Sequence, residues 1–266
     1  MAENSIQFTA DIAEIYEKYL APVFFISTSK DLVTHIPGSP AKILELAAGT
    51  GQVTRILVER YPDAKIFATD LNPGMLDVAK RIVTSENITW DIVNAEEIPY
   101  SSDEFDALIC QFGIMFFPDK PKALGEAYRV LKPGGTITFN TWDKLENNHI
   151  CKLADDAVKS VFPVDPPQFY HIPFSMYDTV EMAKMMESAG FKNVKVENRK
   201  MEGFSDSAEN AVLAFTQGNP MALQIKERDE SKLPEVKAAM LDNFKEHFGN
   251  GHFKIPLSEF IVTAIK

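Results

Sequence analysis

The chain has 266 residues, of which 45% are hydrophobic and 24% charged, and 38 acidic side chains against 27 basic ones give a formal net charge of −11. A phosphate-binding surface needs clustered lysine and arginine, and the sequence has no basic stripe, so we expect no binding to nucleic acid or to a membrane. No run approaches the ~20 apolar residues that cross a bilayer, and no basic, apolar signal segment follows Met1. We therefore expect a cytoplasmic globular protein.

The cysteine content argues against structural disulfides and metal ions. Cys110 and Cys151 are the two cysteines, and their wide separation fits neither a disulfide framework nor the spacing of a metal site. Cys110 lies in an apolar run, which is typical of a small buried core residue. We expect no metal.

Residues 6–36 are predicted to form one or two helices. Apolar and aromatic residues recur there at helical spacing, and Pro22 is expected to interrupt the helix. The turn formers of 37–40 mark a boundary. We interpret 1–36 as an N-terminal helical lid and 37–266 as the main domain.

Short apolar strands alternate with helices from residue 41 to residue 142. The pattern predicts strands at 42–47, 65–70, 88–93, 105–110 and 136–142, with helices at 53–61, from Pro73 onward and at 120–131. Such alternation is typical of right-handed, parallel β-α-β units with helices on both faces of the sheet. We predict an α/β protein with a Rossmann-like sheet.

The pattern loosens after Trp142. Helices are expected at 146–161, 179–189, 207–216 and 234–248, an edge strand at 194–201, a final strand at 260–265, and a proline-rich loop at 163–173. The charged segment 226–232 is interpreted as a solvated linker or a helix face. We treat about 203–250 as a helical cap inserted into the main domain.

The strongest chemical signal is a glycine turn between the first strand and the first core helix. It reads Ile-Leu-Glu-Leu-Ala-Ala-Gly-Thr-Gly over 43–51. Glycines let the backbone turn sharply and leave room for a ligand at the carboxyl end of the strand. Asp70 ends the next strand, 21 positions after Gly49, as does the carboxylate that binds ribose hydroxyls in nucleotide-binding units. We predict an adenosine-containing ligand.

Three features favour S-adenosylmethionine over a dinucleotide. The third glycine of a dinucleotide motif is replaced by Thr54. Glu45 lies just before the turn, where a carboxylate suits an ammonium group. Acidic residues, Glu96 and Glu97, follow the third strand.

These motifs together resemble the class I S-adenosylmethionine-dependent methyltransferases, and most closely the type 11 and quinone-biosynthesis C-methyltransferases. The resemblance covers residues 40–142 well and the remainder in outline. It rests on five segments in the correct order, namely Glu45–Gly51, Thr69–Met75, Asn94–Pro99, Phe105–Asp106 and Arg129–Gly135. It implies a seven-stranded, mostly parallel sheet with an antiparallel last strand.

The resemblance also implies residue roles at the methionine and ribose end of the cofactor. Ala47, Gly49 and Gly51 would line the methionine portion. Asp70 would hold both ribose hydroxyls, and Gln111 would lie under the methionine end, near the acceptor. Gln111 opens an apolar segment, 111–117, whose position at a strand end is typical of a pocket lining.

At the adenine end, the resemblance places Leu71 against the ring and Met75 nearby. Ala95 and Glu96 would border the adenine edge. Asn94 stands where the family usually has aspartate, and its amide oxygen can still accept a hydrogen bond.

Methyl transfer from a sulfonium is a direct displacement, so the protein mainly aligns nucleophile, methyl and sulfur. A base is needed only where the acceptor must lose a proton. No catalytic residue is therefore assigned, and His149, His171 and Tyr16 are weak candidates by location. The aromatic residues of the lid and cap predict a small apolar or aromatic acceptor in a covered pocket.

Three other functions stay open from the sequence. An NAD-dependent oxidoreductase is disfavoured by Thr54, and a noncatalytic cofactor-binding partner by the intact set of Gly49, Gly51 and Asp70. An aminopropyl transferase would need a doubled acidic polyamine site, which is not evident. The atom that receives the methyl group, and the choice between monomer and homodimer, are not specified.

Overall fold

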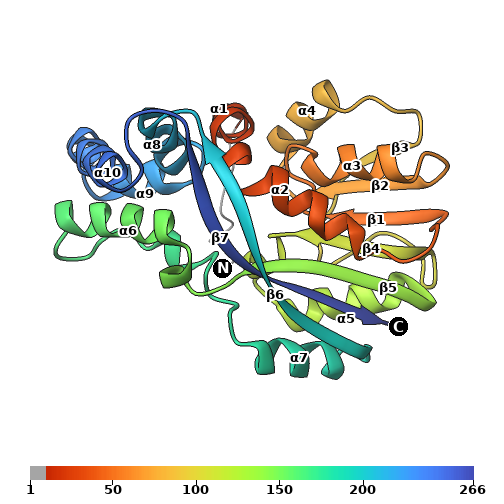
Figure 1. The fold of residues 1–266 in the computed structure, drawn as a ribbon. Coiled ribbons are helices and arrows are strands. Elements are labelled where there is room, and N and C mark those ends of the chain that lie inside the picture. The colour runs from red at the N-terminus through yellow and green to blue at the C-terminus, as the bar shows by residue number, and fades with distance from the viewer. Residues whose placement is uncertain (1–9) are drawn as a thin grey trace.

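The computed structural model describes residues 10–266. Within that range the strands form one seven-stranded sheet in the order β3-β2-β1-β4-β5-β7-β6 (Figure 1). The neighbours among β1 to β5 pair in parallel, and β7 pairs antiparallel with both β5 and β6. The bounds are β1 Lys42–Leu46, β2 Lys65–Asp70, β3 Ile88–Ile92, β4 Phe105–Gln111, β5 Leu131–Trp142, β6 Lys192–Ser205 and β7 Phe253–Ile265. The predicted fold class is confirmed.

Helices cover both faces of the sheet. α2, α3 (Gln52–Arg60) and α4 (Pro73–Ile82) lie on one face, whereas α5 (Lys120–Val130) and α7 (Thr179–Ser188) lie on the other (Figure 1). Successive residues of β1 therefore enter different cores: Leu44 packs in the cluster of Phe105, and Ile43 in the cluster of Leu57. Burial on both faces explains why the parallel strands are almost continuously apolar.

The N-terminal segment is one continuous helical rod. It runs through α1 (Ala10–Ile15), a π-helical turn η1 (Tyr16–Leu20) and α2 (Ala21–Thr34). The prediction that Pro22 interrupts the helix is wrong. Pro22 occupies the first turn of α2, and the backbone N–H of Ala21 bonds to the carbonyl oxygen of Tyr16 in the wider π turn. A proline in a first turn has no intrahelical N–H bond to lose.

The helical insertion lies between β6 and β7. It contains α8 (Ala208–Gln217), α9 (Met221–Asp229), η5 (Glu230–Lys232) and α10 (Leu233–Phe248), and α6 (His149–Val161) packs beside α10 (Figure 1). The charged segment 226–232 belongs to α9 and η5, because Met221 and Ile225 bury one face of that helix. Both β6 and β7 are longer than predicted and reach from the core into this cap.

Short helical turns complete the connections: η2 (Ile114–Phe116), η3 (Leu145–Asn147) and η4 (Phe169–His171). From residue 10 to residue 266, no helix combines the length and the apolar character needed to cross a membrane.

Gly203 is where α2 meets the edge of the sheet most closely. A Cβ atom there would lie 1.8 Å from the carbonyl oxygen of Val23. We expect Gly203→Ala to lower the free energy of unfolding by about 3 kcal/mol, since neither backbone can yield freely. Gly125 in α5 has open space around it, so Gly125→Ala should instead stabilise the protein by about 1 kcal/mol. Urea titrations of both variants measure these two changes. Equal changes in the free energy of unfolding would contradict the tight α2–β6 contact.

Candidate active site

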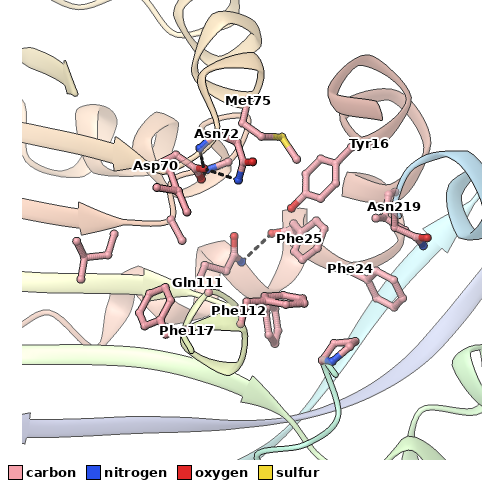
Figure 2. Close-up of a pocket in the computed structure, with 18 of the residues that line it drawn as sticks. Tyr16, Phe24, Phe25, Asp70, Asn72, Met75, Gln111, Phe112, Phe117 and Asn219 are labelled. Carbon is pink, nitrogen blue, oxygen red and sulfur yellow. Dashed lines mark hydrogen bonds between the residues drawn. The ribbon is translucent and has the colours of Figure 1, made fainter. Parts of the chain in front are cut away.

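A large cavity opens at the carboxyl ends of the central parallel strands, beneath the N-terminal rod and the cap. Its sheet side is lined by Leu46, Ala47, Gly49, Asp70, Leu71, Asn72, Met75, Val93, Asn94, Ala95, Gln111, Phe112, Gly113, Phe116, Phe117 and Pro118. Its cap side is lined by Tyr16, Leu20, Phe24, Phe25, Trp142, Cys151, Phe169, Tyr170, Pro173, Phe174, Phe215 and Asn219. Figure 2 shows the two sides facing each other. Most of the segment 111–117 lines the cavity, whereas Ile114 and Met115 pack in the core.

The glycine turn is held to the end of β2 by Asp70. Ala47 and Gly49 have positive φ angles of 54° and 56°, and the N–H of Gly49 donates to Asp70 Oδ2 at 2.9 Å. Asp70 Oδ1 accepts the N–H of Asn72 at 2.8 Å. Burial raises the pKa of this carboxyl, and those backbone donors oppose the rise. A carboxylate with four acceptor positions keeps capacity for a ligand.

Gly51 packs instead of lining the cavity. Its φ is 83°, and a Cβ there would meet Val83 Cγ2 at 3.1 Å and Ala79 Cβ at 3.3 Å. The second glycine therefore lets α3 begin close to α4. Gly51 keeps the turn sharp without contacting the cavity.

Glu45 also lies outside the cavity lining. Its carboxyl is 1% exposed and accepts a 2.6 Å hydrogen bond from the hydroxyl of Thr54. Burial raises its pKa to about 8. The residue that replaces the third glycine is thus the partner of a buried acid, which draws Glu45 away from the ammonium position that we expected.

At the end of the cavity near β2 and β3, an exposed apolar side chain lies beside the residues that follow β3. Leu71 is 52% exposed, whereas Met75 is buried in α4. Asn94 and Ala95 follow β3 and line this end. Glu96 was expected here but does not line the cavity. Its carboxylate instead accepts the N–H of Asp119, the residue just before α5, at 2.8 Å.

Gln111 ties the sheet side to the N-terminal rod. Its Nε2 donates to Thr28 Oγ1 at 2.9 Å and to the carbonyl oxygen of Phe25 at 3.3 Å (Figure 2). The amide is therefore fixed between β4 and α2.

The N-terminal rod is bonded directly to the glycine turn. Glu17 in η1 accepts hydrogen bonds from Thr50 Oγ1 at 2.6 Å, Gln52 Nε2 at 2.7 Å and Arg55 Nη2 at 2.7 Å. Tyr16 stacks on Phe25 with ring centroids 4.9 Å apart, and its hydroxyl points into the cavity (Figure 2). Burial raises the pKa of Tyr16 well above its usual range.

The cap side of the cavity is aromatic and carries no charged group. Phe24 packs against Trp142 and Phe215, with centroids 5.1 and 5.5 Å apart. Tyr170 donates its hydroxyl to the carbonyl oxygen of Phe215 at 2.7 Å, and Asn219 is bonded to neighbouring backbone. Across the lining residues of the described chain, Asp70 is the only carboxylate, and lysine, arginine and histidine are absent.

The comparisons with known proteins agree with this geometry. A family model described as a methyltransferase domain matches residues 43–135. The ubiquinone/menaquinone biosynthesis C-methyltransferase UbiE of Francisella philomiragia is 30% identical over 172 residues, which are 59% of this chain and 69% of that protein. The mitochondrial 2-methoxy-6-polyprenyl-1,4-benzoquinol methylase of Caenorhabditis elegans is 30% identical over 174 residues, and the match spans only 61% of its length.

The chain belongs to the class I S-adenosylmethionine-dependent methyltransferases, in the quinone-biosynthesis-like group.

Solved structures carry the same fold. The phosphoethanolamine N-methyltransferase 2 of Haemonchus contortus superposes with a TM-score of 0.62 at 16% identity, over 98% of this chain and 58% of that one. The [4+2]-cyclase SpnF gives the same TM-score at 16% identity and covers 97% of that chain. The fold match thus extends beyond residues 40–142 into the cap.

Both histidines proposed as catalytic candidates lie outside this methyltransferase's cavity. His149 is exposed at the start of α6, where its ring contacts His247 with centroids 5.1 Å apart. His171 is also exposed, and its Nε2 lies 3.6 Å from Asp155. Neither histidine is among the residues that line the cavity. Tyr16 remains as a candidate by position.

Several lining residues were not predicted. Trp142 and Phe174 approach the cavity because β5 ends there and the proline-rich loop folds back over it. Asn72 and Asn219 lie at its two ends. Trp142 ends a predicted strand, so the sequence could have placed it at this edge of the sheet. The contacts of the loop and the cap depend on tertiary packing and could not be predicted in this way. No group of three or more potential metal ligands occurs among the described residues.

The pKa of Glu45 implies a pH-dependent contribution to stability. The folded protein keeps the proton up to about pH 8, whereas the ordinary value is 4.5, so the folded state binds more protons in that window. Stability from this group is complete below the ordinary pKa and declines as pH rises toward 8, on the order of 1.4 kcal/mol per pKa unit at most.

Glu45→Gln removes this titration. The unfolding free energy of the variant, relative to the unsubstituted protein, should therefore rise between pH 5 and pH 8. Chemical denaturation across that range measures the difference, in which all other titrating groups cancel. Parallel stability curves would show that Glu45 is ionised in the fold.

Proposed function

We propose that this methyltransferase transfers the methyl group of S-adenosylmethionine to a small aromatic acceptor held in the uncharged, aromatic half of the cavity. The observation that carries the proposal is the division of the cavity. One end has a carboxylate beside a glycine turn, and the other has aromatic rings without an ionic partner.

The residues at the first end suit the cofactor. Asp70 would accept the ribose hydroxyls with the acceptor capacity that its hydrogen bonds from the N–H of Gly49 and from the N–H and side-chain Nδ2 of Asn72 leave. Leu71 would lie against the adenine, since an exposed leucine next to a polar group fits an apolar ring joined to a sugar. Asn94 and Ala95 would border the adenine edge. Met75 would pack behind the nucleoside.

The other end of the cofactor would lie on the glycine turn. Ala47 and Gly49 would line the methionine portion, with Gln111 beneath it and close to the acceptor. Gly51, Glu45 and Glu96 would act indirectly, through packing and hydrogen bonds that hold this turn and its neighbours. When bound, the cofactor supplies the electrophilic methyl group, and these residues orient it toward the aromatic half.

The acceptor half favours an aromatic ring such as a quinol. The relatives are named as methyltransferases for a benzoquinol or for ubiquinone and menaquinone biosynthesis. Phe24, Trp142 and Phe215 pack against one another in tilted and edge-on contacts, and such a group of rings suits a flat aromatic ligand. An ammonium or phosphate acceptor would find no charged partner there. Tyr16, whose hydroxyl faces the junction of the two halves, would orient the acceptor instead of accepting its proton at neutral pH.

The N-terminal rod (residues 10–36 of the expected 1–36 lid) and the helical insertion (within about 203–250) would close this pocket. Phe8, also expected to contribute, lies outside the described residues. The hydrogen bonds of Glu17 to the glycine turn would couple closure of the rod to occupancy of the cofactor end. A cytoplasmic location and a monomeric or homodimeric state remain predictions.

Asp70→Asn tests the cofactor end. The amide offers one acceptor where the carboxylate offers two oxygens, so we expect the Kd for S-adenosylhomocysteine to rise roughly 10- to 100-fold. Calorimetry measures it, with exposed Asp77→Asn on α4 as the matched control and NADH as a ligand expected not to bind. Unchanged affinity in folded Asp70→Asn would contradict the assigned ribose contact.

Phe215→Ala tests the acceptor half, with reduced 1,4-naphthoquinone as the probe acceptor and labelled S-adenosylmethionine as the donor. Loss of a buried ring should lower kcat/KM for the quinol roughly 10- to 100-fold and leave cofactor affinity unchanged. Phe248→Ala is the control, because that ring stacks on Phe253 outside the cavity. If Phe215→Ala and Tyr16→Ala both leave acceptor kinetics unchanged in folded protein, the aromatic half is not the acceptor site.

A further inference from the structure

A hydrogen-bond chain from the buried middle of β7 reaches the backbone of the acceptor cavity. Asn140 on β5 is fully buried, and its Oδ1 accepts the N–H of Phe112 at 2.9 Å. Its Nδ2 donates to Glu259 Oε2 at 2.6 Å. Glu259 is also fully buried, although it belongs to neither the cavity lining nor the glycine turn.

The chain ends at a strained residue. Phe112 has a φ of 47°, in the left-handed region that costs a residue with a Cβ on the order of 1 kcal/mol or more. β4 ends at Gln111, so the next N–H has left the sheet ladder and depends on the Asn140 side chain. A side-chain amide can present either its oxygen or its nitrogen, and Glu259 fixes the orientation that offers the oxygen to Phe112.

The position of Phe112 sets both halves of the cavity. Its ring stacks on Trp142 with centroids 3.8 Å apart and planes inclined by 8°. The next residue, Gly113, passes so close to the glycine turn that a Cβ would lie 2.5 Å from Ala47 Cβ. A shift of this bend would therefore move the acceptor surface and the methionine surface together.

We propose that Glu259 and Asn140 are positioning residues, which hold Phe112 in its left-handed conformation and so fix the Phe112–Trp142 stack as the rigid floor of the acceptor cavity. Glu259 does not touch the cavity and acts through Asn140. Its Oε1 has no hydrogen-bond partner among the described residues. Burial raises the pKa of Glu259 to about 8, which agrees with a neutral group.

The neutral state makes a conservative rescue possible. Glutamine keeps the length and one acceptor oxygen, so Glu259→Gln should preserve the bond from Asn140. Glu259→Met keeps the length but removes the acceptor, which leaves the buried amide of Asn140 unpaired. The two variants therefore separate hydrogen bonding from volume.

Tryptophan emission reports the result without any acceptor. The sequence has two tryptophans, so a Trp90→Phe background leaves Trp142 as the sole emitter. We expect Glu259→Met to shift the Trp142 emission and to raise its quenching by acrylamide, whereas Glu259→Gln retains the unsubstituted spectrum. The KM for reduced 1,4-naphthoquinone should rise about tenfold in the Met variant only, and the Kd for S-adenosylhomocysteine should rise in the same variant, because the bend also contacts Ala47.

Val262→Ala on the opposite face of β7 controls for general loss of stability, because it removes buried volume and no hydrogen bond. An unchanged Trp142 spectrum in folded Glu259→Met, or the same change in Glu259→Gln or Val262→Ala, would overturn the proposal. If Glu259→Met does not fold, Asn140→Ser carries the same expectation, since a serine at that position cannot bridge Glu259 and Phe112. Failure of the quinol as a substrate in every variant would contradict the proposed acceptor and leave the emission test intact.

Discussion

The hydrogen bond from the N–H of Gly49 to Asp70 is the constraint on which the site depends. It joins the turn after β1 to the end of β2, and it places the one carboxylate among the described lining residues beside backbone in a left-handed conformation. Because β1 is the sheet's switch point, with β2 on one side and β4 on the other, everything that follows those strands converges there. The same bend that admits a ligand is thus held by the group that would bind its sugar.

The acceptor half is built from segments at both ends of the chain. The N-terminal rod brings Tyr16, Phe24 and Phe25, and the insertion between β6 and β7 brings Phe215 and Asn219. Long strands carry that insertion over the cavity, while Gly203 lets α2 lie against β6 without a side chain between them. The cofactor half needs only the β-α-β core. The acceptor half exists only when rod, cap and core are packed together.

The β-α-β core could be predicted because its signals are local. Apolar runs, the glycine turn and Asp70 at the end of the next strand specify element type and order through short-range geometry. The resemblance to the methyltransferases placed Leu71, Met75, Asn94, Ala95 and Gln111 near the cofactor, and all five line the cavity. The π turn before Pro22 and the outward positions of His149 and His171 could not be predicted, because they depend on which helix face is buried. Glu45 was misplaced for a related reason: its partner, Thr54, lies one helical turn into α3 and becomes a neighbour only in the fold.

Two buried acids in this protein hold neighbouring segments in place through hydrogen bonds without adding negative charge to the site. Glu45 and Glu259 both have pKa values raised to about 8 by burial, and each is bonded to a neutral polar side chain. While these two acids carry their protons, they hold their hydrogen-bond partners in place. They add no negative charge near the proposed apolar acceptor or beside Asp70. Among the described lining residues, the one carboxyl group at the cavity is then Asp70. A polar framework of neutral groups behind an aromatic surface can hold that half of the cavity rigid without adding charge to it, which suits the aromatic acceptor proposed above.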